Sequence, residues 1–362
     1  MKPTDPLRKQ IQALPSYLGG KRKLLSWIST SLAEICPPSA WSNKTFIDLF
    51  RGGGAVSLWA KAQGFKTVIS NDISVRSQLI SDAFLTNHRI QLSTADTLWL
   101  TQPLPEQTGW IETCYSPSVF STRHARILDQ GFFWAEQHGD PVKRALLKIL
   151  MWHLAHEFVA FPTSLGTSNR PFAEALDGLR DWGSINPKRF TDGSVQRLCR
   201  PGWQRLSEKR RVINRGVLGG SPVQAYQQDA LTLLPQIQGD ILYLDPPYPG
   251  TLSYERENSV LDSLLTGDPH PPKVPTSAFS HSTDPLNDLL EQAQHIPIWV
   301  LSYGNKTCTL EELIAQVERH ANGRMVKGFS RYYRHLTHVS QNKDNQEFLV
   351  LAYPPQEISI CR

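Results

Sequence analysis

Short apolar runs along the chain predict the central strands of a sheet. The clearest is Ile241–Leu244, and similar runs begin at Thr45 and Thr67. Each run carries an acidic residue at or near its carboxyl end: Asp48, Asp72 and Asp245. A glycine turn and the start of a helix follow the first run, which is the arrangement of a ligand-binding turn on a doubly wound α/β sheet.

A helix is predicted over residues 141–160, because apolar side chains recur there at helical spacings. His153 and His156 lie in this segment, and we expect them on helix faces, since their spacing is not that of a metal-binding His-Glu-x-x-His motif. The glycine turn and Asp245 are about 190 residues apart, which is more than the few elements between them require. We therefore expect an insertion, and we place it at residues 89–215.

The glycine turn, Phe50 to Gly54, allows the backbone to approach a ligand closely. It lacks the Gly-Lys-Ser/Thr of a Walker loop and the spacing Gly-x-Gly-x-x-Gly. Asp72 follows about 20 residues later, where an acid can bind the hydroxyls of a ribose. A tight turn without a ligand, and a helix N-cap at Asp72, are the structural alternatives.

Asp245-Pro246-Pro247-Tyr248 follows the strand predicted at 241–244. A carboxylate and a proline carbonyl can accept the two N–H bonds of an amino group, and a tyrosine ring can stack on a base. Two prolines fix the backbone and remove two donors, which leaves their carbonyls available. An ordinary strand-to-loop turn is the alternative, because such dipeptides are common in loops.

Near the amino terminus, Tyr17, two glycines and Lys21 precede a short amphipathic helix. Lys21 could hold a carboxylate, and Tyr17 could flank an aromatic ring. A surface turn would have the same composition.

Taken in this order, the four segments resemble the Dam-like alpha group of DNA adenine-N6 methyltransferases, which use S-adenosylmethionine. Weaker similarities cover residues 228–230, 299–303 and 347–352. The resemblance implies a Rossmann-like doubly wound mixed sheet, the S-adenosylmethionine-dependent methyltransferase fold, with an inserted, mainly helical target-recognition domain. The implied boundaries are 1–88 for the first catalytic part, 89–215 for the insertion and 216–362 for the second catalytic part.

The resemblance also implies residue roles. Asp245, Pro246, Pro247 and Tyr248 would be catalytic. The cofactor would contact Tyr17, Lys21, Asp48, Phe50, Gly52, Gly54, Asp72, Asp229 and Asp245. Arg51 departs from the family pattern, and it could contact the cofactor carboxylate, a DNA phosphate or solvent. The implied reaction is direct methyl transfer to an adenine rotated out of the duplex.

The net charge of +5 permits an anionic partner, and its distribution is more informative. Basic residues gather at 197–215 and at 319–343, where they suit phosphate contact. We expect double-stranded DNA as the partner, contacted by Arg205, Lys209, Arg210 and Arg211. A solvated helix face is the alternative for either segment.

Five cysteines, at 36, 114, 199, 308 and 361, form no short-spaced cluster, so reduced thiols without a metal site are expected. The chain lacks a continuous run of about 18 apolar residues, and its first residues are polar. We expect a cytoplasmic monomer that does not enter a membrane, with a cognate restriction endonuclease as a second partner.

The proline-rich stretch 266–285 is expected to form neither a helix nor a central strand, and we hypothesise that it is a mobile loop that orders over DNA. Alternative functions are methylation of cytosine N4, RNA or protein glutamine, and DNA binding without catalysis. The presence of Asp48, Asp72 and Asp245 argues against a catalytically inactive homologue. A nicotinamide dehydrogenase is disfavoured by the glycine spacing.

Overall fold

The computed structural model describes residues 5–17, 19–104, 106–158, 202–247, 254–270, 279, 284–332 and 345–355. Within these ranges, seven strands form one sheet in the order β3-β2-β1-β4-β5-β7-β6. The strands are β1 (Thr45–Asp48), β2 (Thr67–Asn71), β3 (Val223–Tyr226), β4 (Ile241–Leu244), β5 (Ile298–Gly304), β6 (Met325–Tyr332) and β7 (Gln346–Tyr353). The first five lie parallel, and β7 runs antiparallel to both β5 and β6. The predicted mixed, doubly wound α/β fold is confirmed.

Alternate residues of the central strands face two separate apolar layers. Phe46 and Tyr243 join one buried cluster, whereas Ile47 and Leu242 join the other. Since both faces are covered, the strands have no solvent-facing side, which explains their continuous apolar sequence.

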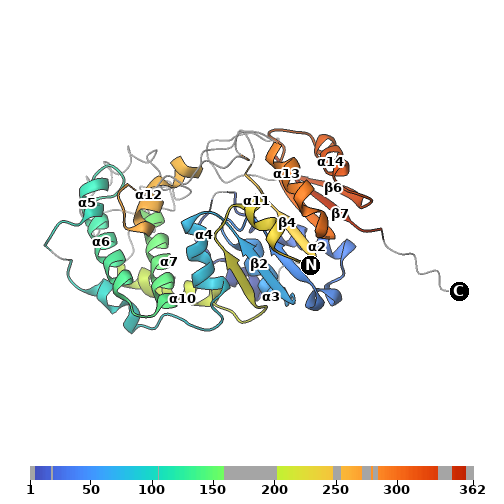
Figure 1. Cartoon of the computed structure of the whole chain (residues 1–362). Coiled ribbons are helices and arrows are strands. Elements are labelled where there is room, and N and C mark those ends of the chain that lie inside the picture. Colours follow the sequence, from blue (N-terminus) through green and yellow to red (C-terminus); the bar gives the residue numbers. More distant parts are fainter. Residues whose placement is uncertain are drawn as a thin grey trace.

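Different helices cover the two faces of the sheet. The first cluster includes side chains from α1 (Asp5–Ile11), α2 (Leu25–Ile35), α3 (Ala55–Gln63) and α12 (Tyr254–Thr266). The second includes side chains from α11 (Ala230–Leu233), α13 (Asp284–Gln292) and α14 (Leu310–Arg319). Figure 1 shows α13 and α14 beside β6 and β7, in orange and red.

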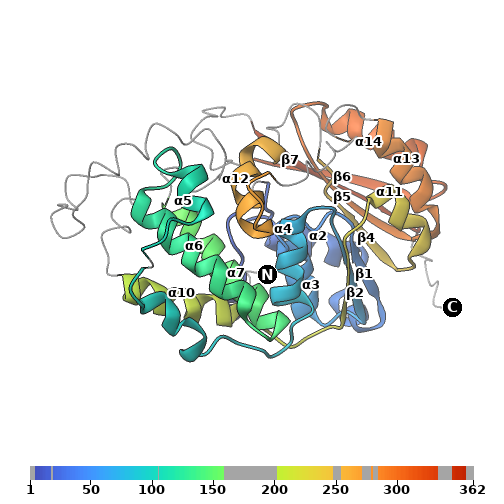
Figure 2. The same cartoon turned by 60° about the vertical axis from the view of Figure 1, so that its left-hand side comes forward.

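A group of helices lies to one side of the sheet, built from residues that follow α4 (Val75–Ile80). Figure 2 shows them together: α5 (Trp110–Tyr115), α6 (Thr122–Gln137), α7 (Pro141–Phe158) and α10 (Gly202–Gly216). Helix α7 packs against α4 and against the π-helix Ser81–Leu85. Its apolar residues continue the first cluster without a break, so these helices and the sheet share one core.

The helix predicted over 141–160 is confirmed as far as Phe158, where the described range ends. His153 Nε2 donates to the Ala13 carbonyl oxygen at 2.9 Å, and His156 Nδ1 lies 3.2 Å from the Trp152 carbonyl oxygen. Burial lowers the pKa of His153 to about 3 and that of His156 to about 4. Both are neutral helix-face residues, and His153 joins α7 to the segment after α1.

The strand order reverses between β1 and β4, and in sheets of this kind the ligand crevice lies at that point. From β1 the chain moves outward through β2 to β3, and it then returns to the other side of β1 with β4 and β5. Such a reversal opens a ligand site at the carboxyl ends of the two central strands. Asp48 ends β1, Asp72 follows β2, and Asp245 follows β4, so all three predicted acids lie along this edge.

The proline-rich stretch 266–285 lies largely outside the described residues. Its two ends are described: α12 continues to Thr266 and stops at Gly267, whose φ is +73°, and α13 begins at Asp284. Pro285 therefore stands in the first turn of a helix, a position that proline tolerates. The expectation of no helix is wrong at these two ends. Among the described residues, none of the helices has the length and apolarity needed to cross a bilayer.

Candidate active site

Three side chains from distant parts of the chain meet at the carboxyl end of β4. Lys21 Nζ lies 3.0 Å from Asp245 Oδ1 and 2.8 Å from Glu347 Oε1. The Lys21 side chain is 7% exposed, that of Asp245 is 19% exposed, and that of Glu347 is fully buried. A buried cation needs such paired partners, because an isolated charge in the interior is strongly unfavourable.

Opposing effects act on the pKa of Asp245. Burial raises its pKa to about 6, while the neighbouring Lys21 ammonium lowers it and the Glu347 carboxylate raises it. The carboxylate is consequently ionised at neutral pH, yet it remains more basic than an aspartate in water. A partly exposed acceptor with a fixed orientation is what an amino group in this crevice would need.

Asp48 is buried at the end of β1. Its Oδ2 accepts a 2.6 Å hydrogen bond from Ser57 Oγ, and Ser57 Oγ also lies 2.7 Å from Ser70 Oγ. Within the described part of the chain, Asp48 Oδ1 has no hydrogen-bond partner. Burial raises the pKa of Asp48 to about 7, and the nearby charge of Asp245 raises it further. An unsatisfied buried oxygen beside a crevice suits a ligand that brings a donor.

Asp72 connects the second strand to the glycine turn. Its Oδ2 accepts from the Gly52 backbone N–H at 2.8 Å, and its Oδ1 accepts from the Ser74 backbone N–H at 2.8 Å. The helix N-cap is Ser74, whose side chain accepts from the Ser77 N–H, so the predicted alternative of an N-cap at Asp72 is wrong. Each Asp72 oxygen retains a further lone pair, which leaves capacity for a pair of hydroxyls.

Tyr17 packs directly on the glycine turn. A Cβ placed on Gly53 would lie 2.7 Å from Tyr17 Cβ, and one on Gly52 would lie 3.3 Å from Tyr17 Cε1. Gly52 and Gly54 also have positive φ angles, +48° and +73°, which side-chain-bearing residues rarely adopt. The amino-terminal element and the glycine turn therefore form one wall of the site.

Arg51 is buried inside the turn and does not point to solvent. Its guanidinium donates to the Ser70 carbonyl at 3.2 Å, to Gln78 Oε1 at 3.3 Å and to the Tyr226 carbonyl at 3.4 Å. The cation also lowers the pKa of Asp48. The open question about Arg51 is thus partly answered: its guanidinium links the turn after β1 to β2, β3 and α4, and it lies near the Asp48 and Asp72 carboxylates.

Two further predicted residues, Phe50 and Asp229, make their described contacts elsewhere. Phe50 is half-buried and makes an edge-to-face contact with Phe279, with ring centroids 5.3 Å apart. Asp229 is exposed, and its side chain caps α11 by accepting from the Thr232 N–H at 3.0 Å. Asp229 has a structural role in the described contacts, and its contact with a cofactor stays a prediction.

A comparison with known protein families matches the region that holds half of this site. The model of the D12 class N6 adenine-specific DNA methyltransferase family matches residues 17–116, which include Tyr17, Lys21, the glycine turn and Asp72. Residues 17–116 of the chain are similar to this family. The predicted resemblance and the predicted class of enzyme, a site-specific adenine DNA methyltransferase, are confirmed.

Curated relatives extend over most of the chain. Type II methyltransferase M2.HphI of Haemophilus parahaemolyticus is 27% identical over 317 residues, which cover 86% of this chain and 88% of that protein. Type II methyltransferase M.NlaIII of Neisseria lactamica is 27% identical over 74% of each chain. Modification methylase LlaI of Lactococcus lactis subsp. lactis is 24% identical over 88% of this chain and 51% of its own length.

The residues at the carboxyl ends of β1, β2 and β4 fit the methyl donor that the matched family implies, S-adenosylmethionine. Four acids, Asp48, Asp72, Asp245 and Glu347, lie at or near the carboxyl ends of these strands, with the bases Lys21, Arg51 and Arg76 among them. Such carboxylates can accept hydrogen bonds from the hydroxyl and ammonium groups of this ligand. The unsatisfied Asp48 oxygen fits a ligand that brings such a donor. Among the described residues, no group of His, Cys, Asp and Glu side chains could hold a metal ion.

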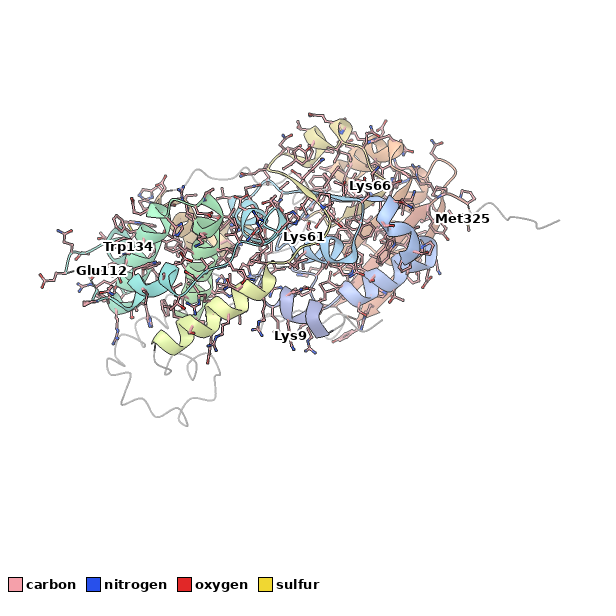
Figure 3. All side chains as sticks on the ribbon, turned by 90° about the horizontal axis from the view of Figure 1, so that it is seen from below. Lys9, Lys61, Lys66, Glu112, Trp134 and Met325 are labelled. Atoms are coloured by element: carbon pink, nitrogen blue, oxygen red, sulfur yellow. The ribbon has the colours of Figure 1, made fainter. Side chains whose placement is uncertain are left out.

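The basic residues predicted for DNA binding lie on α10, which Figure 3 shows from below, next to α1 and the labelled Lys9. Lys209 pairs with Glu157 at 2.6 Å, Arg210 is half-buried, and Arg211 is exposed. The Arg205 side chain lies outside the described residues. In the second basic segment, Lys327 pairs with Glu34 at 2.6 Å, and residues 333–344 lie outside the description.

Sequence reasoning missed two residues of the site, Glu347 and Ser302. Ser302 Oγ donates to Glu347 Oε1 at 2.7 Å, and both side chains are buried. The available signal was a single acid at the start of the apolar run 348–352 in a late strand. Of the predicted catalytic tetrad, Pro246 is buried and Pro247 half-buried beside Asp245, whereas Tyr248 lies outside the described residues.

Proposed function

We propose that the Asp245 carboxylate accepts a hydrogen bond from the N6 amino group of an adenine rotated out of DNA. The methyl group would come from S-adenosylmethionine bound over the glycine turn. The observation that carries this proposal is the position of Asp245. It follows β4 at the switch point of the sheet, next to the turn, with its carboxylate fixed by Lys21 at 3.0 Å.

The chemistry explains why such an acceptor is needed. The lone pair of an adenine amine is delocalised into the ring, so the nitrogen attacks electrophiles poorly. An ionised Asp245 accepting one N–H bond, with the Pro246 carbonyl accepting the other, would orient the amine and favour a more pyramidal nitrogen. When bound, S-adenosylmethionine supplies the electrophilic methyl group. No covalent intermediate with the enzyme is required, so positioning and electrostatics supply most of the acceleration.

Named residues of the crevice would hold the cofactor. Asp72 would accept from the ribose hydroxyls, the backbone at Gly52–Gly54 would allow close approach, and Asp48 would face the ammonium group. Tyr17 would shape the wall that the glycines form. Among the described contacts Lys21 pairs with Asp245 and Glu347, so it would act through Asp245, and its contact with the cofactor stays a prediction.

Target recognition is assigned to residues 89–215, with the boundaries given above. The described elements of this interval include the helices α5, α6, α7 and most of α10, which lie to one side of the sheet (Figure 2). DNA phosphates would contact Arg205, Lys209, Arg210 and Arg211, which would make binding sensitive to salt. Stacking of Tyr248 on the rotated base remains part of the proposal.

A restriction endonuclease is the proposed functional partner, because two relatives are named as Type II methyltransferases and a third as a modification methylase. A monomer and a cytoplasmic location are proposed with it.

The proposal is tested by transfer of labelled methyl groups from S-adenosylmethionine to unmethylated genomic DNA and to RNA, followed by nucleoside analysis. N6-methyladenine in DNA alone is the expected product. Label in N4-methylcytosine or in RNA would contradict the assignment, as would absence of transfer by protein that binds S-adenosylmethionine.

A further inference from the structure

Glu347 is a fully buried acid whose two carboxylate oxygens have different surroundings. Its Oε1 receives Lys21 Nζ at 2.8 Å and Ser302 Oγ at 2.7 Å. Its Oε2 has no hydrogen-bond partner among the described residues. A buried carboxylate with one unsatisfied oxygen is unfavourable for folding by itself, so its presence calls for another explanation.

The position of Glu347 gives that explanation. It lies in β7, where its partner in the adjacent strand β5 is Gly304, and Ser302 stands two residues before that glycine. From there Glu347 reaches the amine of Lys21, which comes from the amino-terminal loop. Lys21 in turn reaches Asp245 after β4. Three separate chain segments are therefore joined through one ammonium group.

A lysine side chain is long and flexible, so a single ion pair fixes its amine poorly. Among the described contacts, two carboxylates hold the Lys21 amine, and one of them is itself held by a serine hydroxyl. The location of the amine then determines which Asp245 oxygen is engaged and which remains for another donor.

We propose that Glu347 is a positioning residue for methyl transfer, which holds the Lys21 ammonium in place and so fixes the orientation and charge of Asp245. This inference rests on the proposed function, in which Asp245 accepts the adenine amine. Glu347 touches neither substrate nor cofactor in this assignment and acts through Lys21.

The titratable groups around Asp245 come from several elements. Lys21 approaches from the amino-terminal loop, Glu347 from β7 by way of Lys21, Asp48 from β1, and the Tyr243 phenol from β4. After burial, the Lys21 charge is the largest influence on the pKa of Asp245 and lowers it, whereas the Glu347 charge raises it. Removing each charge should shift the titration of Asp245 in opposite directions.

The experiment compares Glu347→Gln and Lys21→Met with the wild-type enzyme in single-turnover methyl transfer between pH 5 and 9. In Glu347→Gln the maximal rate is expected to fall about 10- to 100-fold, because the lysine is held less firmly. The acidic limb of its pH–rate profile is expected to move to lower pH, by about half a unit or more, because the Glu347 charge that repels the Asp245 carboxylate has been removed. In Lys21→Met the acidic limb is expected to move to higher pH. The dissociation constant of S-adenosylmethionine should change less than about threefold in Glu347→Gln.

Glu34→Gln is the matched control, since Glu34 also pairs with a lysine, Lys327, but at the surface. It should leave the rate and the pH profile unchanged. If Glu347→Gln does not fold, Ser302→Ala tests the inference instead, because it removes one hydrogen bond to the Oε1 oxygen of Glu347. A rate reduced about fivefold or more, with unchanged cofactor affinity, would support positioning.

A Glu347→Gln enzyme that is less stable but has the wild-type rate and pH profile would overturn the inference and leave a structural role. A Ser302→Ala enzyme with the wild-type rate would overturn it if the first variant is unfolded. Failure of the proposed function looks different, because the wild-type enzyme itself would then not methylate adenine in DNA.

Discussion

Lys21 Nζ lies 3.0 Å from Asp245 Oδ1, and this contact joins the loop before α2 to the carboxyl end of β4. The family match over residues 17–116 ends far before Asp245. The ion pair therefore connects the matched region to the predicted catalytic tetrad through space. The two halves of the site, separated by the helical group in the sequence, form one crevice at the switch point of the sheet.

The rate of methyl transfer is expected to fall as the pH drops through about 6. Burial raises the pKa of Asp245 to about 6. Since an acid is ionised above its pKa, the accepting carboxylate is present at neutral pH and is lost below about pH 6. Single-turnover rates at saturating substrates measure this limb, and a rate that stays constant down to pH 4.5 would exclude Asp245 as the titrating acceptor.

Asp48→Asn is expected to change how stability depends on pH. Burial raises the pKa of Asp48 from the ordinary 3.8 to about 7. Between these values the folded state keeps a proton that the unfolded state has lost, so the stability of the wild-type protein falls as the pH rises. This decline, on the order of 2 to 4 kcal/mol, is absent for an amide.

Denaturant unfolding of both proteins at pH 5 and pH 8 measures the difference. The variant should gain stability relative to the wild-type protein at pH 8, and parallel pH profiles would show that Asp48 is not perturbed. S-adenosylmethionine affinity, measured by calorimetry at pH 8, should fall in the variant, because the carboxylate proposed to face the ammonium group is gone.

Gly53→Ala is expected to disturb the wall between the amino-terminal element and the glycine turn. The new Cβ would lie 2.7 Å from Tyr17 Cβ and 3.0 Å from Tyr17 Cγ. Tyr17 must then move, at a cost of about 1–3 kcal/mol in the free energy of unfolding. S-adenosylmethionine affinity should weaken as well, because the wall of its proposed pocket shifts.

Gly139→Ala is the control for this substitution, since a Cβ at Gly139 meets nothing within 4 Å. Its stability and cofactor affinity should match those of the wild-type protein. Equal behaviour of the two variants would mean that Tyr17 and the glycine turn are not packed as described.

Arg211→Ala, combined with Arg210→Ala, is expected to weaken DNA binding without changing S-adenosylmethionine affinity. Each lost phosphate contact should reduce the slope of log K against log salt by about 1. Lys66→Ala is a suitable control, because Lys66, labelled in Figure 3, is exposed and precedes β2, whereas Asp72 follows that strand. If the double variant and the control share the wild-type salt slope, α10 does not contact DNA.

Much of the fold could be predicted from local patterns in the sequence. Apolar runs ending in acids gave the strands β1, β2 and β4, because strands buried on both faces have no polar side. The helix at 141–158 followed from its apolar spacing. The positions of Asp48, Asp72 and Asp245 at one edge followed from parallel pairing, in which carboxyl ends of strands meet.

Other features depend on contacts between distant residues, which no local pattern contains. Arg51 could not be placed, because its partners, the Ser70 and Tyr226 carbonyls, come from two other strands. Glu347 was visible only as an acid next to an apolar run, and its role depends on Lys21 lying beside it. Asp72 resembled a helix N-cap, and only the following Ser74 showed which residue performs that function.

The most direct test of the central claim is single-turnover methyl transfer by Asp245→Asn with saturating S-adenosylmethionine and unmethylated DNA. The substitution keeps the shape of the side chain and removes its charge. The rate is expected to fall by about 10²-fold or more, with the fold intact by circular dichroism and cofactor still bound. Formation of N6-methyladenine at the wild-type rate by this variant would contradict the assignment of Asp245 as the acceptor of the adenine amine.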